Sequence, residues 1–254
     1  DSSIEAGREV LKIYKDTPKA VEIKKDNSPL TKADIESNNL IIRKLKKITP
    51  SVPILSEESD DIPFKERKRW KQFWLIDPLD GTKEFLNKNG EFTINIALIE
   101  NNIPIIGVIH TPVFKETYFG SIEDGSFMQV GYDHKKSISV SSENNLPTRV
   151  LTSRSHPSDE LINWMEGKNN IEISEMGSSL KFCQIAKGTA DFYPRFGPTS
   201  EWDTAAGHAI VNYAGGSIIT LENQDLRYNT KESLINPNFV VSRSKNLSKI
   251  MLSN

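Results

Sequence analysis

The segment 72–110 constrains the fold more than any other part of the sequence. It contains closely spaced strand signals, rich in β-branched and aromatic residues, at Gln72–Ile76, Phe92–Ile99 and Ile103–His110. Asn101 and Asn102 join the last two of these strands, and such a short polar link is typical of a hairpin. This part of the chain is therefore predicted to contain antiparallel pairing.

Helical and strand signals alternate on both sides of this segment. Before it, amphipathic periodicity predicts helices up to about Lys15 and from Thr31 to about Lys46. After about Ser142, strands and helices alternate, with signals at 149–152, 158–165, 171–174, 178–187, 202–213 and 217–221. The sequence predicts a mixed α/β (α+β) fold with an N-terminal half at 1–142 and a C-terminal half at 143–254, sharing one active site.

Composition excludes several classes of protein. With 254 residues, 37% hydrophobic and 26% charged, the chain has the composition of a soluble globular protein. A net charge of -2 gives no basic field for a nucleic-acid polymer. The basic run at 65–69 is interleaved with Glu66, and we interpret it as a solvated loop. The apolar stretch Ile103–Ile109 is too short to span a membrane, so no transmembrane segment is expected.

The single cysteine and the start of the chain bear on location. Cys183 excludes an internal disulfide, fits a reducing compartment and is expected to pack in the interior. Asp1 opens an amphipathic pattern instead of a signal peptide, and we expect a few residues to precede it. These features favour a cytoplasmic protein, with peripheral attachment at the inner membrane left open.

The segment Trp74–Thr82 carries the most functional information. An apolar strand runs directly into Asp77 and Asp80, which are followed by Gly81 and Thr82. Two carboxylates and the carbonyl of Leu79 are oxygen ligands of the kind that Mg²⁺ prefers. A helix starting after Gly81 could also offer backbone amides to a phosphate. The alternative interpretation is an ordinary turn after a strand, where Asp, Pro and Gly are expected in any case.

Further acidic residues extend this pattern, and each has a structural alternative. Glu57 and Glu58 end another short apolar strand, although acidic residues also continue into an exposed run. Asp203 opens a helix with small residues in its first turns, where Ser200 and Asp203 could form a capping box. Asp34 has a similar capping alternative with Thr31. Taken together, Glu57, Asp77, Asp80 and Asp203 supply a ligand set for roughly two or three Mg²⁺ ions.

The sequence resembles the inositol-monophosphatase-like superfamily of metal-dependent, lithium-sensitive phosphatases. The resemblance rests on the strand-borne Glu57-Glu58, on the motif 77–82 and on the later Trp202-Asp203, in this order. Within the superfamily the chain is similar to the 3'(2'),5'-bisphosphate nucleotidases of bacterial CysQ type. The matching segments are 81–85, 89–97 and 193–198, and the resemblance covers nearly the whole chain.

The resemblance implies a role for individual residues. Metal ligands would be Glu57, Asp77, the Leu79 carbonyl, Asp80 and Asp203, while Thr82 and Asp34 would be the catalytic pair that orients and deprotonates the attacking water. Substrate-binding residues would be Glu57, Asp80, Gly81, Thr82, His156, Ser178, Lys181, Arg195 and Asp203. Lys181 and Arg195 offer positive charge for a second phosphate. His156 could instead be a plain loop residue, and Lys181 could lie on a solvated helix face.

The resemblance also implies a fold and an activity. The fold would be a layered α/β/α/β/α sandwich of the inositol monophosphatase or fructose-1,6-bisphosphatase type. The activity would be Mg²⁺-dependent hydrolysis of adenosine 3',5'-bisphosphate to AMP and phosphate, with its sulfated analogue as a further substrate, as part of sulfur metabolism. Alternatives are an inositol or sugar phosphatase on the same scaffold and, from another class, a regulatory nucleotide-binding protein without catalysis.

Overall fold

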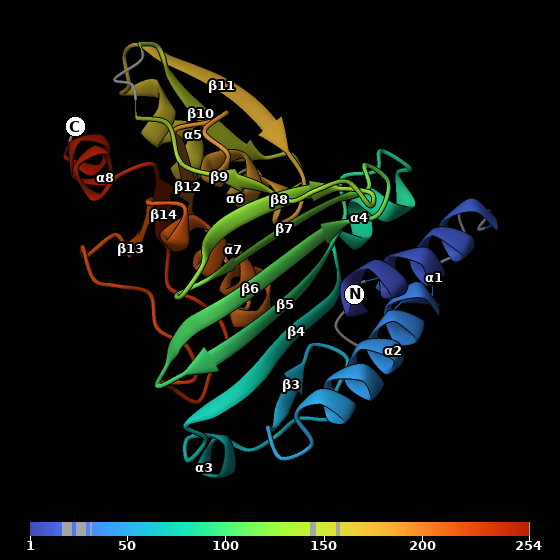
Figure 1. Ribbon diagram of the computed structural model, residues 1–254. Helices are drawn as coiled ribbons and strands as arrows, with labels where there is room; N and C mark the ends of the chain where they lie inside the picture. Colours follow the sequence, from blue (N-terminus) through green and yellow to red (C-terminus); the bar gives the residue numbers. More distant parts are fainter. Residues whose placement is uncertain (17–21, 24–28, 31, 143–145, 156–157, 254) are drawn as a thin grey trace.

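The structure is a computed structural model in which two β-sheets alternate with layers of helices (Figure 1). It describes residues 1–16, 22–23, 29–30, 32–142, 146–155 and 158–253. A small antiparallel pair, β1 (Glu22–Ile23) and β2 (Pro29–Leu30), stands apart from the two large sheets. The rest of the described chain builds the layers that position the site.

The first sheet has seven strands, and their spatial order follows the sequence from β3 to β9. The strands are β3 (Ile54–Ser56), β4 (Gln72–Asp80), β5 (Thr93–Glu100), β6 (Ile103–Thr111), β7 (Glu116–Ser121), β8 (Gly125–Val130) and β9 (Lys136–Ile138). The pair β3 and β4 is parallel, while the other neighbours are antiparallel. The predicted hairpin is confirmed, since Asn101 and Asn102 join β5 to β6 with φ of 49° and 66°, a conformation that Asn tolerates.

Two long helices cover one face of this sheet. Helices α1 (Ser2–Asp16) and α2 (Lys32–Ile48) lie side by side, with α1 against β5 and β6 and α2 against β4 (Figure 1). Residues of β4 and β5 that face these helices, such as Ile76 and Ile94, are fully buried. The alternation of strand side chains therefore directs one set of apolar residues to this layer and the other set to the opposite face.

The second sheet has five strands in the order β11-β10-β12-β14-β13. Its strands are β10 (Thr148–Ser153), β11 (Ile171–Met176), β12 (Phe192–Arg195), β13 (Ser217–Thr220) and β14 (Phe239–Ser242). Strand β10 pairs in parallel with β11 and β12, whereas β14 pairs antiparallel with β12 and β13. The mixed α/β class expected from the sequence is confirmed.

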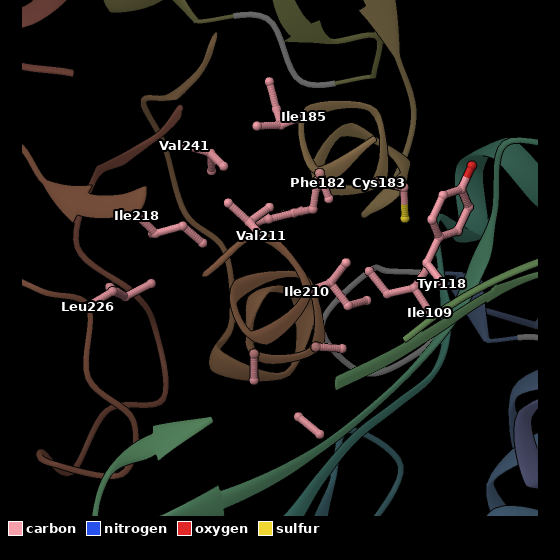
Figure 2. Packing of buried hydrophobic residues seen from close by; sticks show 14 of the residues in the cluster. Ile109, Tyr118, Phe182, Cys183, Ile185, Ile210, Val211, Ile218, Leu226 and Val241 are labelled. Atoms are coloured by element: carbon pink, nitrogen blue, oxygen red, sulfur yellow. The ribbon is translucent and has the colours of Figure 1, made fainter. Parts of the chain in front are cut away.

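The layer between the two sheets is formed by α6 (Leu180–Ala186) and α7 (Glu201–Tyr213). Figure 2 shows Ile210 and Val211 of α7 among Phe182 of α6 and Ile109 of β6. A Cβ atom on Gly207 would lie 2.3 Å from the Phe182 ring, so the small residues of α7 permit the close approach expected of them. Each fully buried Ile or Phe in such a core stabilises the fold by about 1.5–3 kcal/mol. Cys183 is buried in this layer, as predicted.

The outermost layer consists of α5 (Asp159–Glu166) and α8 (Lys245–Leu252) on the far face of the second sheet. Trp164 of α5 stacks on Phe192 of β12, with ring centroids 5.5 Å apart. The layered α/β/α/β/α arrangement is therefore confirmed. Because α7 follows residue 143 and yet packs against the first sheet, the division into 1–142 and 143–254 stays a prediction.

The basic run at 65–69 is not a solvated loop, which corrects the interpretation of the sequence. Residues Phe64–Arg67 form the short helix α3, and Arg67 is buried. Its guanidinium donates a 2.6 Å hydrogen bond to Asn229 Oδ1 and another to the carbonyl oxygen of Glu232. Only Lys65, Lys68 and Arg69 of the basic residues in the run lie at the surface.

No helix among the described residues is long and apolar enough to cross a membrane. The cytoplasmic location stays a prediction, and nothing in the described structure supports peripheral attachment to a membrane.

Candidate active site

The sequence Asp77-Pro78-Leu79-Asp80 occupies an irregular end of β4. Pairing with β5 is regular up to Asp77, opposite Asn95, and then shifts in register before Asp80. Asp77 Oδ1 accepts a 3.0 Å hydrogen bond from the backbone N–H of Leu79. Because such an irregularity re-aims side chains, Asp77 is buried while Asp80 lines a cavity.

Glu57 lies beside this turn because β3 and β4 are parallel. Ser56 is the register partner of Ile76, and the N–H of Glu57 donates a 3.1 Å hydrogen bond to the carbonyl of Ile76. Parallel strands end at the same edge of a sheet. The two acid-bearing strand ends predicted from the sequence are therefore neighbours in space.

Helix α2 is hydrogen-bonded to the ends of both strands. The hydroxyl of Ser37 donates a 2.8 Å hydrogen bond to the carbonyl of Pro78, and the hydroxyl of Ser56 donates a 2.7 Å bond to Asn38 Oδ1. Both contacts are buried, where an unpaired polar group would be costly. Asp34, in the first turn of the same helix, is 1% exposed, and its negative charge contributes to raising the pKa of Asp77.

Asp203 comes to the site from α7 and also caps that helix. Its Oδ2 accepts a 2.9 Å hydrogen bond from the N–H of Ser200, which completes the predicted capping box. Asp203 also lines the same cavity as Asp80 and Glu57. Capping and a place at the site are therefore compatible, because a carboxylate has two oxygens. The alternative capping partner of Asp34, Thr31, lies outside the described residues.

Glu57, Asp80 and Asp203 line one cavity of about 210 Å³, which Thr82 also lines. Burial raises the pKa of Asp77 well above its usual value, and the charges of Glu57 and Asp80 raise it further. The pKa of Asp203 is raised by burial and then by Asp80 and Glu57. Burial also raises the pKa of Asp80, although Lys181 and the N–H of Ser179 oppose the shift. The negative charge of these acidic residues is thus incompletely compensated by the protein.

The acidic side chains at the cavity do not converge on a single point. Among the described residues, no three acidic, histidine or cysteine side chains lie close enough together to enclose a metal ion as placed. The donor set nevertheless consists of carboxylate oxygens with mutually repelling charges, the chemistry that hard divalent cations require. The residues fit a metal such as Mg²⁺.

Gly81 and Thr82 continue from the acidic turn into the short helix α4 (Thr82–Leu86). Gly81 has a φ of 92°, a conformation that favours glycine, and a Cβ there would lie 3.1 Å from Ser178 Cβ. Thr82 lines the cavity and Asp34 is buried near Asp77. The role of Thr82 and Asp34 as the catalytic pair that orients and deprotonates the attacking water stays a prediction.

Lys181 lines the same cavity as the acids and is buried. It is therefore not on a solvated helix face, which was one of the two interpretations of the sequence. Its side chain is 3% exposed, and Nζ donates hydrogen bonds to the carbonyls of Met176 (3.0 Å) and Ser178 (2.6 Å). Nζ also lies over the Tyr193 ring, 5.2 Å from its centroid. Burial lowers the pKa of Lys181 to about 8, even though Asp80 favours the charged form.

Arg195 is the second cation of this cavity. It is 8% exposed, lines the cavity and donates a 2.9 Å hydrogen bond from Nη2 to the carbonyl of Pro198. Its Nε is buried without a hydrogen-bond partner among the described residues. A buried donor of this kind favours an anionic partner. Ser178 lines the same cavity, whereas His156 lies outside the described residues.

A buried hydroxyl and amide network behind Asp80 was missed by the sequence analysis. The N–H of Ser179 donates a 2.6 Å hydrogen bond to Asp80 Oδ2. The Ser179 hydroxyl contacts Thr93 Oγ1 at 2.7 Å and donates to Asn95 Oδ1 at 2.8 Å. The polar residues Thr93 and Asn95 within an otherwise apolar strand were the available signal, since buried polar groups need partners.

Glu201 was also missed. It precedes Trp202-Asp203, is fully buried, and its Oε2 accepts a 2.7 Å hydrogen bond from the N–H of Asn229. Burial raises the pKa of Glu201 to about 7. No sequence pattern distinguishes it from a surface acid at a helix start.

Comparison with known proteins assigns the family. The model of the inositol monophosphatase family matches residues 1–251 of the chain. The chain therefore belongs to the inositol monophosphatase family. Within it, the chain is similar to the 3'(2'),5'-bisphosphate nucleotidase CysQ of Salmonella typhimurium, with 44% identity over 239 residues, 93% of this chain and 95% of the relative. CysQ of Escherichia coli is likewise 44% identical over 238 residues, covering 93% and 95% of the two chains.

Solved structures agree with this assignment. The crystal structure of CysQ from Bacteroides thetaiotaomicron is similar to the chain with a TM-score of 0.84 and 39% identity, covering 95% of this chain and 94% of the other. The IMPase of Thermotoga maritima, 24% identical, has the same fold, with a TM-score of 0.82 and coverage of 99% and 92%. The fold type expected from the sequence is confirmed, and the family consists of metal-dependent phosphatases.

Proposed function

We propose that this chain is a Mg²⁺-dependent phosphatase that hydrolyses the 3'-phosphate of adenosine 3',5'-bisphosphate to AMP and phosphate. The observation that carries the proposal is a single cavity lined both by the carboxylates Glu57, Asp80 and Asp203, here called the acidic wall, and by Lys181 and Arg195, here called the cationic wall. A substrate with two phosphates needs both kinds of wall. The similarity to nucleotidases of CysQ type supports the same substrate.

The acidic wall would hold the metal. Roughly two or three Mg²⁺ ions would be bound by Glu57, Asp77, Asp80 and Asp203 together with the carbonyl of Leu79. When bound, they supply charge neutralisation at the scissile phosphate and a lowered pKa for the attacking water. The raised pKa values of Asp77 and Asp203 support this role, because a cation would relieve the repulsion that causes part of the shift.

Thr82 and Asp34 would handle the proton of the attacking water. The Thr82 hydroxyl accepts a hydrogen bond from the water while it donates one to Asp34, which fixes the direction of attack. As the oxygen of the water bonds to phosphorus and the bond to the 3'-oxygen breaks, one proton of the water passes through Thr82 to the Asp34 carboxylate, and the leaving 3'-oxygen takes a proton from a solvent water to become the 3'-hydroxyl of AMP. Burial of Asp34 suits this role, because it keeps bulk water away from the carboxylate that receives the proton.

The cationic wall would bind the rest of the substrate. Arg195, with an unpaired Nε, and Lys181 would contact the second phosphate, while Ser178 and Gly81 would shape the space between the two phosphates. Specificity would reside here, because the acidic wall acts on any scissile phosphate.

A substrate panel tests the proposal. Phosphate release is measured from adenosine 3',5'-bisphosphate, inositol 1-phosphate, fructose 1,6-bisphosphate and NADP, with and without Mg²⁺ and with added Li⁺. We expect the adenosine bisphosphate to have the highest kcat/KM, a requirement for Mg²⁺ and inhibition by Li⁺, because a monovalent ion at an oxygen site neutralises less charge. Preference for inositol or sugar phosphates would contradict the substrate assignment, and no release from any substrate would indicate a non-catalytic nucleotide-binding protein.

A further inference from the structure

Glu91 joins the N-terminal part of the chain to two segments of the C-terminal part. It lies between α4 and β5, and its side chain is 17% exposed. Its carboxylate accepts 2.9 Å hydrogen bonds from Nε and Nη2 of Arg154, which follows β10. It also accepts a 2.8 Å hydrogen bond from the backbone N–H of Gly177, which follows β11. One carboxylate of the N-terminal part thus holds two segments of the C-terminal part.

The turn at residues 177–179, which Glu91 contacts through the N–H of Gly177, has a strained backbone. Ser178 has a φ of 45°, in the left-handed region that non-glycine residues rarely adopt. A Cβ on Gly177 would lie 2.5 Å from Glu84 Cγ, so the turn is pressed against α4. A strained conformation persists only where surrounding contacts determine it. The hydrogen bond to Glu91 is one such contact, and the bond from Lys181 Nζ to the Ser178 carbonyl is another.

The same turn forms part of the cavity. Ser178 and Ser179 line it, and the N–H of Ser179 donates to Asp80. A shift of the turn would therefore move the part of the cavity lining that Ser178 forms, whereas Ser179 is held separately by the contacts of its hydroxyl with Thr93 and Asn95. A second contact secures the neighbouring segment, because the Ser155 hydroxyl donates a hydrogen bond to Glu84.

We propose that Glu91 is a positioning residue that holds the 177–179 turn in the conformation which presents Ser178 and Lys181 to the nucleotide's second phosphate. This inference rests on the proposed function for the identity of the substrate. Burial alone would raise the pKa of Glu91, but the hydrogen bonds from Arg154 and Gly177 outweigh it, and the pKa lies below its usual value. The carboxylate is charged at neutral pH, which strengthens both contacts.

Three variants separate the contacts of Glu91. Glu91→Ala removes both contacts, and Glu91→Gln keeps an acceptor for the Gly177 N–H but removes the charge. Arg154→Met removes the ion pair with Glu91 while leaving the Gly177 contact, and it also removes the contacts of Arg154 with Glu175. Glu9→Gln is the matched control, because Glu9 on α1 forms an exposed ion pair with Lys12 and does not line the cavity. All four are compared with the wild type by steady-state kinetics on adenosine 3',5'-bisphosphate and by amide hydrogen exchange.

We expect Glu91→Ala to raise KM about tenfold with kcat within about twofold, because it removes ground-state binding and leaves the chemistry in place. Glu91→Gln and Arg154→Met should raise KM about two- to threefold, since each keeps part of the interaction. Amides of the 177–179 turn should exchange faster in Glu91→Ala. Glu9→Gln should match the wild type in both measurements.

The proposed role of Glu91 and the proposed function would be contradicted by different results. A lower melting temperature with unchanged KM in Glu91→Ala would show a structural role only, and unchanged exchange of the turn would show that Glu91 does not hold it. If Glu91→Ala does not fold, wild-type KM values in both Glu91→Gln and Arg154→Met contradict the proposal. If the wild type releases no phosphate, the proposed function is contradicted. If the wild type releases phosphate and the Glu91 and Arg154 variants have an unchanged KM, only the role of Glu91 is contradicted.

Discussion

The acidic and the cationic residues of the cavity differ in how the protein compensates their charges. On the acidic wall, burial and neighbouring carboxylates raise the pKa values of Asp77 and Asp203. On the cationic wall, Lys181 donates to two backbone carbonyls and Arg195 donates to a third. The negative charge of the acidic residues is thus incompletely compensated by the protein, whereas Lys181 and Arg195 are hydrogen-bonded to the protein's own backbone.

Because of this difference, substitutions of the acidic residues and of the cationic residues should have different effects on activity and on structure. Neutralising an acid should remove activity while leaving the fold intact, because the acid is repelled by its neighbours in the absence of a cation. Replacing a cation should remove hydrogen bonds as well as charge, so that part of its effect is on the position of nearby backbone.

The largest effect is expected for Asp77→Asn. Loss of this carboxylate should lower kcat by roughly a thousandfold or more, since metal ions supply several kcal/mol of transition-state stabilisation. The Asn side chain keeps an acceptor for the Leu79 N–H, and the loss of repulsion should leave the metal-free protein at least as stable as the wild type. Kinetics at saturating Mg²⁺ and thermal unfolding in EDTA measure the two outcomes. Near-normal kcat would remove Asp77 from the metal site.

The next effect concerns Thr82 and Asp34. If they act as one relay, Thr82→Ala, Asp34→Asn and the double variant should each lose roughly a hundredfold in kcat. Residues that act as a unit are non-additive, so the double variant should be no worse than the single ones. A double variant whose loss equals the product of the single losses would leave Asp34 with a structural role in α2.

A smaller effect distinguishes the two cations. Arg195→Met should lower kcat/KM for adenosine 3',5'-bisphosphate by roughly tenfold to a hundredfold, because a charged hydrogen bond contributes about 1.5–3 kcal/mol. A nucleoside 3'-monophosphate should be affected much less. Lys181→Met should lower kcat/KM for both substrates, because Lys181 also donates hydrogen bonds to the carbonyls of Met176 and Ser178. Equal losses on both substrates in Arg195→Met would show that Arg195 does not bind the second phosphate.

The smallest expected effect is a pH dependence of KM. Burial lowers the pKa of Lys181 to about 8, so its positive charge is present below that pH and is lost above it. KM for the bisphosphate should therefore rise a few-fold between about pH 7.5 and 9 in the wild type. Lys181→Arg keeps its charge over this range and should show no rise. A wild-type KM that does not change over this range would contradict the role of Lys181 charge.

Much of the fold could be predicted because its signals are local. The β5–β6 hairpin depends on two asparagines and alternating apolar residues, and the α7 start depends on a capping box. Strands β7, β8 and β9 were not predicted, since their short, mixed sequences are stabilised by neighbouring strands instead of their own propensity.

The site was predictable in part for the same reason. Asp77 and Asp80 stand out because they end an apolar strand, and Glu57 because it ends a second one. Glu91 does not stand out, because its partner Gly177 comes from a distant part of the chain. Arg67 was misinterpreted as a solvated residue for that reason, since only the tertiary structure brings Asn229 to it.

The central claim is that the acidic wall binds the catalytic cations. Calorimetric titration of metal-free protein with Mg²⁺, carried out in parallel on the wild type and on Asp77→Asn, tests it most directly. The account predicts saturable Mg²⁺ binding by the wild type that is weakened by roughly a hundredfold or lost in Asp77→Asn, with both proteins folded. Equal Mg²⁺ affinity in the two proteins, or no binding by a wild type that releases phosphate in EDTA, would contradict it.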